Sequence, residues 1–275
     1  MNPTKIPVSS SPLSRSRTSQ ALMPIGALAG ALLCQDALAG AATFAQTNIQ
    51  YLSGDRYQSI FFNPATGKLD STPETSSVMT IEHVNEWKYG DNFLFIDVTN
   101  PARSDDEFKT GYYGEFSPRL SFGKMTGKGV GTGLFKDVLL TTTAEIGQGF
   151  RNYLYGVAVD LNLPGTPVFQ INYYARHEVS NPAADMGSQV TLVWLKPFTV
   201  GGVALTFEGF YDYAWGMDHV EDNIITAPRL MLDVGQFWET PGVLQAGFEY
   251  QIWRNKYGID GIDEDVVQAM VKWIW

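Results

Sequence analysis

The sequence predicts an all-β fold, a transmembrane antiparallel β-barrel of twelve strands with short periplasmic turns and longer extracellular loops. Apolar and polar residues alternate in short segments along most of the chain, which is the period of a strand with one apolar face. Charged residues make up only 17% of the chain and aromatic residues 13%, whereas about 25% charged is typical of soluble domains. The last strand ends with Trp273 and Trp275, which indicates a closed sheet with its aromatic residues at a lipid boundary.

Residues 1–39 have the pattern of a secretory signal peptide. Arg15 and Arg17 precede an apolar run over residues 21–33, and residues 37–39 supply an A-x-A cleavage pattern. The run is shorter than the roughly 18 residues that a membrane-spanning helix needs, and no apolar run of that length follows it. The sequence therefore predicts export, with a cleaved signal over residues 1–39 and one outer-membrane barrel over residues 40–275.

The charge and cysteine content of the exported part exclude other classes of protein. Cys34 lies within the expected signal peptide, so the mature chain would have no disulfide. Without residues 1–39 the formal net charge falls from −10 to −12, because three bases and one acid are removed. Nucleic-acid binding requires clustered Lys and Arg, so we expect no nucleic-acid partner.

The expected strands are the alternating segments between clusters of Gly, Pro, Asn and Asp. Most are close to the roughly 10 residues that a tilted transmembrane strand needs. In chain order the twelve segments cover residues 44–52, 76–86, 91–98, 113–123, 136–146, 152–162, 167–177, 188–196, 202–214, 227–236, 243–253 and 266–275.

The connections alternate in length, as expected when both termini lie in the periplasm. The expected extracellular loops are mostly long and cover residues 53–75, 99–112, 147–151, 178–187, 215–226 and 254–265. The expected periplasmic turns are mostly short and cover residues 87–90, 124–135, 163–166, 197–201 and 237–242. All seven tryptophans lie at or near segment ends, which predicts an aromatic membrane girdle of Trp87, Trp194, Trp215, Trp238, Trp253, Trp273 and Trp275.

The polar parity of each segment is expected to face the lumen, because Arg or Lys facing lipid at mid-bilayer costs about 2–4 kcal/mol. Twelve strands predict a narrow passage, and the inward acids outnumber the inward bases, so the passage should disfavour phosphates. The acids are Glu82, Glu86, Asp97, Glu115, Glu145, Asp160, Glu208, Asp212, Asp233 and Glu249, and the bases are Arg119, Arg176, Arg229 and Lys272.

Two stretches carry the most specific motifs of the chain. The first is the hairpin over residues 80–97, with the turn Trp87-Lys-Tyr-Gly-Asp91 and the strand Phe93-x-Phe95-x-Asp97. The second is Tyr113-Gly-Glu-Phe-Ser-Pro-Arg-Leu-Ser121. Both resemble the Tsx-like nucleoside-specific channels of outer membranes, and a weaker resemblance extends over about residues 48–275. It implies a monomeric twelve-stranded barrel that admits nucleosides.

The resemblance implies where a nucleoside would bind. Aromatic rings stack on bases at about 1–3 kcal/mol each, and carboxylates accept hydrogen bonds from ribose hydroxyls. The alternative is that the two phenylalanines of the hairpin fill a small barrel, or face lipid. The lumen candidates are Phe93, Phe95, Asp97, Glu82, Glu115, Arg119, Arg176, Glu208, Asp212 and Glu249.

Enzymatic chemistry finds little support in the sequence. His83, His177 and His219 lie in different segments without metal-ligand spacing, and the glycines of residues 127–133 lack the spacing of a phosphate-binding loop. The acidic segments over residues 218–222 and 260–265 could bind calcium, but they are more typical of solvated outer loops.

We therefore expect no catalytic or metal site and no cofactor. The function predicted is a passive nucleoside channel; the alternatives are a nonspecific cation-leaning pore and a plugged surface barrel. The expected partners are outer-membrane lipid, lipopolysaccharide and the barrel-assembly machinery, which would bind the C-terminal strand.

Overall fold

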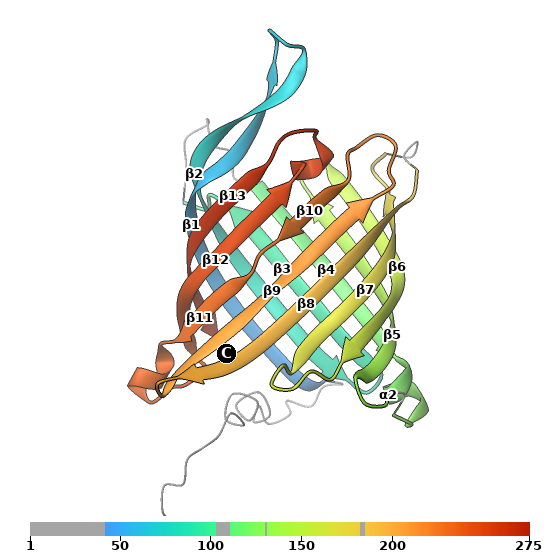
Figure 1. The fold of residues 1–275 in the computed structure, drawn as a ribbon, viewed down its shortest axis with the longest axis vertical. Coiled ribbons are helices and arrows are strands. Elements are labelled where there is room, and N and C mark those ends of the chain that lie inside the picture. Colours follow the sequence, from blue (N-terminus) through green and yellow to red (C-terminus); the bar gives the residue numbers. More distant parts are fainter. Residues whose placement is uncertain (1–41, 103–110, 130, 182–184) are drawn as a thin grey trace, which may run out of the picture.

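The structure, a computed structural model, describes residues 42–102, 111–129, 131–181 and 185–275. They form one antiparallel sheet rolled into a barrel, with strands that run diagonally along its wall (Figure 1). Among these described residues, no helix is both long enough and apolar enough to cross a membrane. The expected signal peptide lies outside the described residues.

The wall has twelve strand positions, because two short segments share one of them. β10 and β11 both lie between β9 and β12. This confirms the predicted fold and number of strands. The strands are β1 Ala42–Asn63, β2 Lys68–Trp87, β3 Gly90–Thr99, β4 Gly111–Ser121, β5 Phe135–Gly147, β6 Phe150–Leu161, β7 Val168–Glu178, β8 Gly187–Val200, β9 Val203–Trp215, β10 Asn223–Thr226, β11 Arg229–Asp233, β12 Leu244–Arg254 and β13 Glu264–Ile274; the helices are α2 Phe122–Thr126, η1 Gly235–Trp238 and η2 Lys256–Gly258.

The barrel closes between its first and last strands. β13 pairs with β1 from Asn48 opposite Ile274 to Gly54 opposite Gln268. Beyond this ladder, the Trp275 N–H donates to the Thr47 carbonyl at 2.9 Å, and the Thr47 N–H donates back at 3.1 Å. The aromatic C-terminal strand therefore has no free edge, as its sequence requires.

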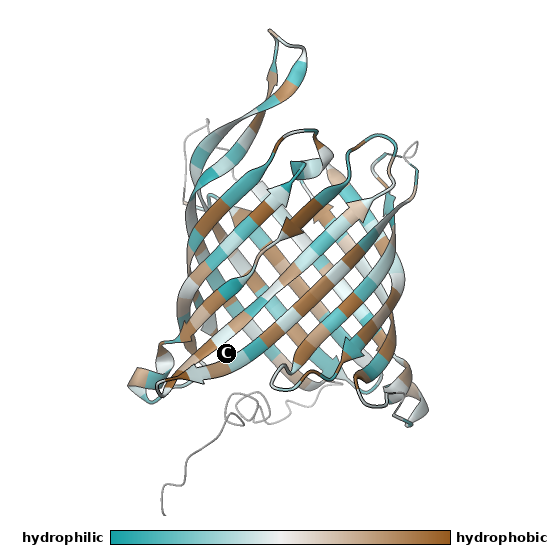
Figure 2. Cartoon of the chain, viewed as in Figure 1, coloured by the Kyte–Doolittle hydropathy of each residue, from teal (hydrophilic) through white to brown (hydrophobic). Residues whose placement is uncertain are grey.

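Each strand places one set of side chains outside and the other inside. On β13, Val267, Val271 and Trp273 are 62%, 48% and 55% exposed, whereas Gln268 and Met270 are 1% and 2% exposed. Hydrophobic and hydrophilic residues alternate along the strands in the same way (Figure 2). An apolar outer face of this kind is stable in lipid, and it has the parity that the sequence predicts for the membrane side.

The first two strands extend far beyond the predicted segments. Residues 53–75 were expected to form a loop, but β1 and β2 stay paired from Tyr57 opposite Glu74 to Asn63 opposite Lys68. This hairpin projects past the rim of the barrel (Figure 1). Outside the membrane no lipid enforces alternation, so this paired segment lacks the pattern that marks the other strands. We call this end of the barrel the loop end and the end with the C-terminus the turn end.

The tenth strand position is divided by a proline. The predicted strand over residues 227–236 is instead β10 and β11 with Ala227 and Pro228 between them, and residues 235–238 form η1. Proline has no N–H for the ladder. The chain nevertheless stays in place, because the Ala227 N–H donates to the Phe210 carbonyl at 3.2 Å and the Tyr250 N–H donates to the Pro228 carbonyl at 2.9 Å.

The predicted turn over residues 124–135 contains a short helix. β4 ends at Ser121, whose hydroxyl accepts a hydrogen bond from the Lys124 N–H at 2.8 Å and so caps α2. Gly127 ends the helix in a left-handed conformation with φ of 65°. The glycine-rich stretch therefore belongs to a connection at the turn end.

Candidate functional site in the barrel lumen

The inward side chains are not equally accessible around the wall. The inward residues of β3, at positions 91, 93, 95, 97 and 99, are all half-buried. The inward residues of β13, at positions 264, 266, 268, 270 and 272, are at most 4% exposed. The β13 side of the lumen is thus filled by side chains, and the accessible inner surface includes the whole length of β3.

Four aromatic rings line this accessible wall, and we call them the aromatic row. The ring centroids of Phe93 and Phe95 are 5.8 Å apart, and those of Phe95 and Tyr113 are 5.7 Å apart. Tyr113 then stacks on Phe150 at 5.9 Å with an angle of 26° between the rings. The row thus crosses from β3 over β4 to β6.

A glycine makes the last contact of the row possible. Gly147 of β5 lies between Tyr113 and Phe150 in the strand register. A Cβ atom at this position would lie 2.2 Å from the Phe150 ring. The missing side chain therefore lets the Phe150 ring lie across β5 toward Tyr113.

The direction of Phe93 and Phe95 follows from strand alternation. Leu94 and Ile96, between and after them, are 37% and 46% exposed on the outer face. Phe93, Phe95 and Asp97 share the opposite face, as expected. The structure therefore places these three predicted candidates in the lumen.

Three carboxylates lie beside the aromatic row without a basic partner. Asp97 accepts a hydrogen bond from the Thr80 hydroxyl, and Glu115 accepts one from the Tyr113 hydroxyl. Glu82 accepts hydrogen bonds from the side-chain amides of β1, at 2.9 and 3.3 Å. Within the described part of the chain, none of the three forms an ion pair.

Arg119, another predicted candidate, is a structural clamp. Its guanidinium donates two hydrogen bonds to Asp91, at 2.8 and 2.9 Å, and two to Asp160, at 2.8 and 3.3 Å. The Arg119 side chain is 6% exposed. It joins β3, β4 and β6 and has little capacity left to bind a solute.

The other inward bases are paired in the same way. Arg176 donates to both oxygens of Glu145 at 2.6 Å and to the side-chain amide oxygen of Gln189 at 2.6 Å. Arg229 donates to Glu249, and Lys272 donates to Glu208.

Two of the predicted candidates, Glu208 and Glu249, therefore lie in ion pairs. Arg229 also approaches Glu208 to 3.9 Å, and the Gln268 amide donates to Glu249 at 2.7 Å. These contacts occupy the carboxylates within the wall on the β11–β13 side.

Asp212 differs from the paired acids. It lies on the inward face of β9 beside Thr191 of β8. Its Oδ1 is shielded from solvent and has no hydrogen-bond partner among the described residues. The predicted inward acids that form no ion pair among the described residues are thus Glu82, Asp97, Glu115, Asp212 and Asp233.

The structure places the predicted girdle tryptophans in three kinds of position. Trp194 lies in the middle of β8, opposite Gly209. Trp253 shares the inward parity of Glu249, and its ring lies 5.2 Å from the Lys256 ammonium. The remaining five lie at strand ends or in η1, at positions 87, 215, 238, 273 and 275.

Sequence reasoning missed two members of the aromatic row. Tyr113 shares the parity of Glu115, so its inward direction could have been found from the same alternation. Phe150 falls within the predicted loop over residues 147–151, where alternation gives no direction.

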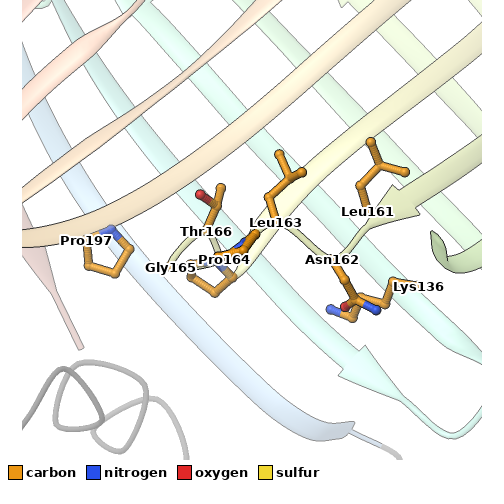
Figure 3. Close-up of a pocket in the computed structure, with 9 residues that line it drawn as sticks. Lys136, Leu161, Asn162, Leu163, Pro164, Gly165, Thr166 and Pro197 are labelled. Atoms are coloured by element: carbon orange, nitrogen blue, oxygen red, sulfur yellow. The ribbon is translucent and has the colours of Figure 1, made fainter. Parts of the chain in front are cut away.

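A separate recess lies at the turn end. It has a volume of about 660 Å³ and is lined by residues 161–167, Lys136 and Pro197 (Figure 3). None of the predicted lumen candidates lines it.

A closed twelve-stranded sheet with an apolar outer face and a lumen of rings and charges defines a transmembrane β-barrel of the channel-forming class. The chain matches the family described as nucleoside-specific channel-forming protein, Tsx, over residues 49–273. It belongs to this family of outer-membrane channels, which confirms the predicted resemblance. The protein is therefore a channel-forming protein and not an enzyme.

The curated relatives that the chain matches are also outer-membrane proteins. The chain is 26% identical over 183 residues to the outer membrane protein OmpK of Vibrio parahaemolyticus, covering 63% of this chain and 68% of that protein. It is 24% identical over 212 residues to OmpK of the serotype O3:K6 strain RIMD 2210633, covering 72% and 78%. Among solved structures, KdgM porin aligns with 82% of this chain and 98% of its own at 10% identity and a TM-score of 0.47.

Proposed function

We infer that the protein is a passive outer-membrane channel whose solutes are nucleosides, and that the aromatic row is the surface on which their bases stack. The observation that carries this proposal is the row of four rings on the accessible wall, beside carboxylates with no ion-pair partner among the described residues. The family match supports the solute class.

The chemistry of the wall suits both halves of a nucleoside. A base stacked on one ring gains about 1–3 kcal/mol, and successive rings lie 5.7–5.9 Å apart. Glu82, Asp97 and Glu115 accept hydrogen bonds from ribose hydroxyls. Weak sites in series bind a solute firmly enough to admit it and loosely enough to release it.

The same carboxylates discriminate against phosphate. A nucleotide would bring its negative charge close to Glu115 and Asp97, whose charges no described base neutralises in an ion pair. Like charges brought together in a narrow, partly desolvated passage repel. The channel is therefore expected to admit nucleosides in preference to nucleotides.

The surroundings of the barrel belong to the same proposal. The exposed tryptophans at the turn end, Trp273 and Trp275, suit the lipid boundary. The loop end would contact lipopolysaccharide. The barrel-assembly machinery would engage β13, and the channel would work as a monomer after removal of the signal peptide.

A second candidate is a plugged surface barrel without transport. One observation favours it: the inward residues of β13 and the inward residues of β5 from Leu139 to Gly147 are all buried. A solute could then pass only along the rest of the wall. Conductance of the purified protein in planar bilayers separates the two candidates, because a plugged barrel would carry no current.

The test of the nucleoside proposal is block of that current by adenosine. A Phe95→Ala variant should need about tenfold more adenosine for half-block, since one stacking contact is lost. Phe248→Ala is the matched control, because Phe248 is 61% exposed on the outer face, and its block should not change. Conductance that adenosine fails to block in the unmodified protein would rule out the nucleoside channel.

A further inference from the structure

We propose that the loop-end half of the lumen also binds aromatic monocations, amines that carry one ring and one positive charge, more tightly than neutral molecules of the same shape. The site uses the aromatic row and rests on the proposed channel function. It adds a second class of solute, selected by charge.

Strand register interleaves rings and carboxylates on one wall. Phe95 of β3 lies opposite Glu115 of β4, and Asp97 lies opposite Tyr113. Phe95 and Tyr113 therefore each have a carboxylate opposite them on the neighbouring strand and another two residues along their own strand. An ammonium group attracted to a ring face would thus lie close to a carboxylate as well.

A third carboxylate faces this wall from the far side of the lumen. Asp212 lies on β9, five strand positions from β4 in the closed wall. Its charge interacts with those of Glu115 and Glu145, so the three groups belong to one electrostatic cluster. The unpartnered and shielded Oδ1 of Asp212 is an acceptor that a bound donor would satisfy.

The nearby base does not neutralise this cluster. Arg176 is engaged by both oxygens of Glu145, which matches one positive charge with one negative charge. Asp97, Glu115 and Asp212 remain without an ion pair among the described residues. Shielded carboxylates without a partner are unfavourable, and a solute cation would relieve this cost.

The arrangement favours an organic cation over a metal ion. The carboxylates alternate with rings instead of converging on one point. Within the described residues, no group of three or more His, Cys, Asp or Glu side chains is placed to hold a metal ion. Rings attract ammonium groups through their faces, whereas divalent metal ions need several oxygen ligands at once.

Three probes with one ring system isolate the effect of charge. Tyramine carries an ammonium group, tyrosol is its neutral alcohol, and 4-hydroxyphenylacetate is the anion. Each is added at neutral pH to single channels of the full barrel in planar bilayers, with adenosine measured in the same membranes. Tyramine should block at about tenfold lower concentration than tyrosol, and 4-hydroxyphenylacetate should block least.

Isosteric variants locate the selectivity. Asp212→Asn should reduce the tyramine preference several-fold while adenosine still blocks. Glu115→Gln should reduce the tyramine preference as well, and it should also weaken adenosine block because Glu115 is a ribose acceptor in the proposed channel function. Asp263→Asn is the control, because its side chain is 51% exposed in an outer loop, and it should leave the preference unchanged.

The outcomes separate the two proposals. Equal block by tyramine and tyrosol, with adenosine block intact, would overturn the cation site alone. A preference that survives both lumen variants would also overturn it, because the charge effect would then arise elsewhere. If adenosine does not block the unmodified protein, the nucleoside channel proposal is overturned instead.

Discussion

Replacing Arg119 with methionine should destabilise the barrel by about 3–5 kcal/mol, the usual cost of removing one partner of a buried ion pair. The Arg119 side chain is 6% exposed, and those of Asp91 and Asp160 are 19% and 14% exposed. The substitution removes four charged hydrogen bonds and leaves two shielded carboxylates facing each other across β4 and β5. Methionine keeps most of the volume, so the loss reports on charge more than on a cavity.

Urea unfolding in detergent micelles, followed by the mobility difference between folded and heat-denatured barrel, measures this cost. Arg254→Gln is the control. Its partner is Asp265, and the two side chains are 40% and 47% exposed, so the loss should stay within about 1 kcal/mol. Adding Asp91→Asn and Asp160→Asn to Arg119→Met should recover part of the stability, because the unpaired charges disappear. Equal stability of Arg119→Met and the control would refute the clamp.

Two further predictions concern the aromatic row and the loop end. Gly147→Ala should displace the Phe150 ring, which a Cβ would approach to 2.2 Å, and should weaken adenosine block with little change in conductance; unchanged block would remove Phe150 from the solute path. Lys256→Met should destabilise the folded barrel by about 3–5 kcal/mol, because it leaves the fully buried Glu264 without its cation, and urea unfolding of the same kind checks this. If the unpaired carboxylate is the cause, the stability of Lys256→Met should rise as the pH falls, and that of the unmodified protein should not. Equal stability of the variant and the unmodified protein would contradict this prediction.

Alternation in the sequence determines the faces of the strands because lipid imposes one rule on all of them. Gln268 and Lys272 were expected inward, and they are 1% and 4% exposed, while Trp273, the residue after Lys272, is 55% exposed on the outer face. The same rule does not apply to the hairpin from Tyr57 to Glu74, which projects past the rim of the barrel. A paired hairpin there has no alternation of apolar and polar residues, so the sequence predicted a loop.

Which side chains form ion pairs inside the lumen depends on the distances between them. Alternation in the sequence gives the face of each side chain but not these distances. Arg119 and Asp160 are 41 residues apart and meet across an intervening strand. Parity alone predicts that both face inward, and it equally allows Arg119 to be free for a solute. Only the register of β4, β5 and β6, together with the reach of the guanidinium, shows that Arg119 is occupied.

The pairing of the bases also determines where free charge remains. Arg119, Arg176, Arg229 and Lys272 each contact at least one inward acid, so these acids contribute little net field. The predicted inward acids left without an ion pair among the described residues lie on β2, β3, β4, β9 and β11. Three of these strands form the wall that carries Phe93, Phe95 and Tyr113. A solute inside the lumen therefore meets stacking surface and unbalanced negative charge on the same side, while the β13 side is filled. The accessible surface and the selective groups coincide because other acids engage the bases: Arg229 and Lys272 are paired on the filled side, Arg119 is paired at the turn end, and Arg176 is paired with Glu145.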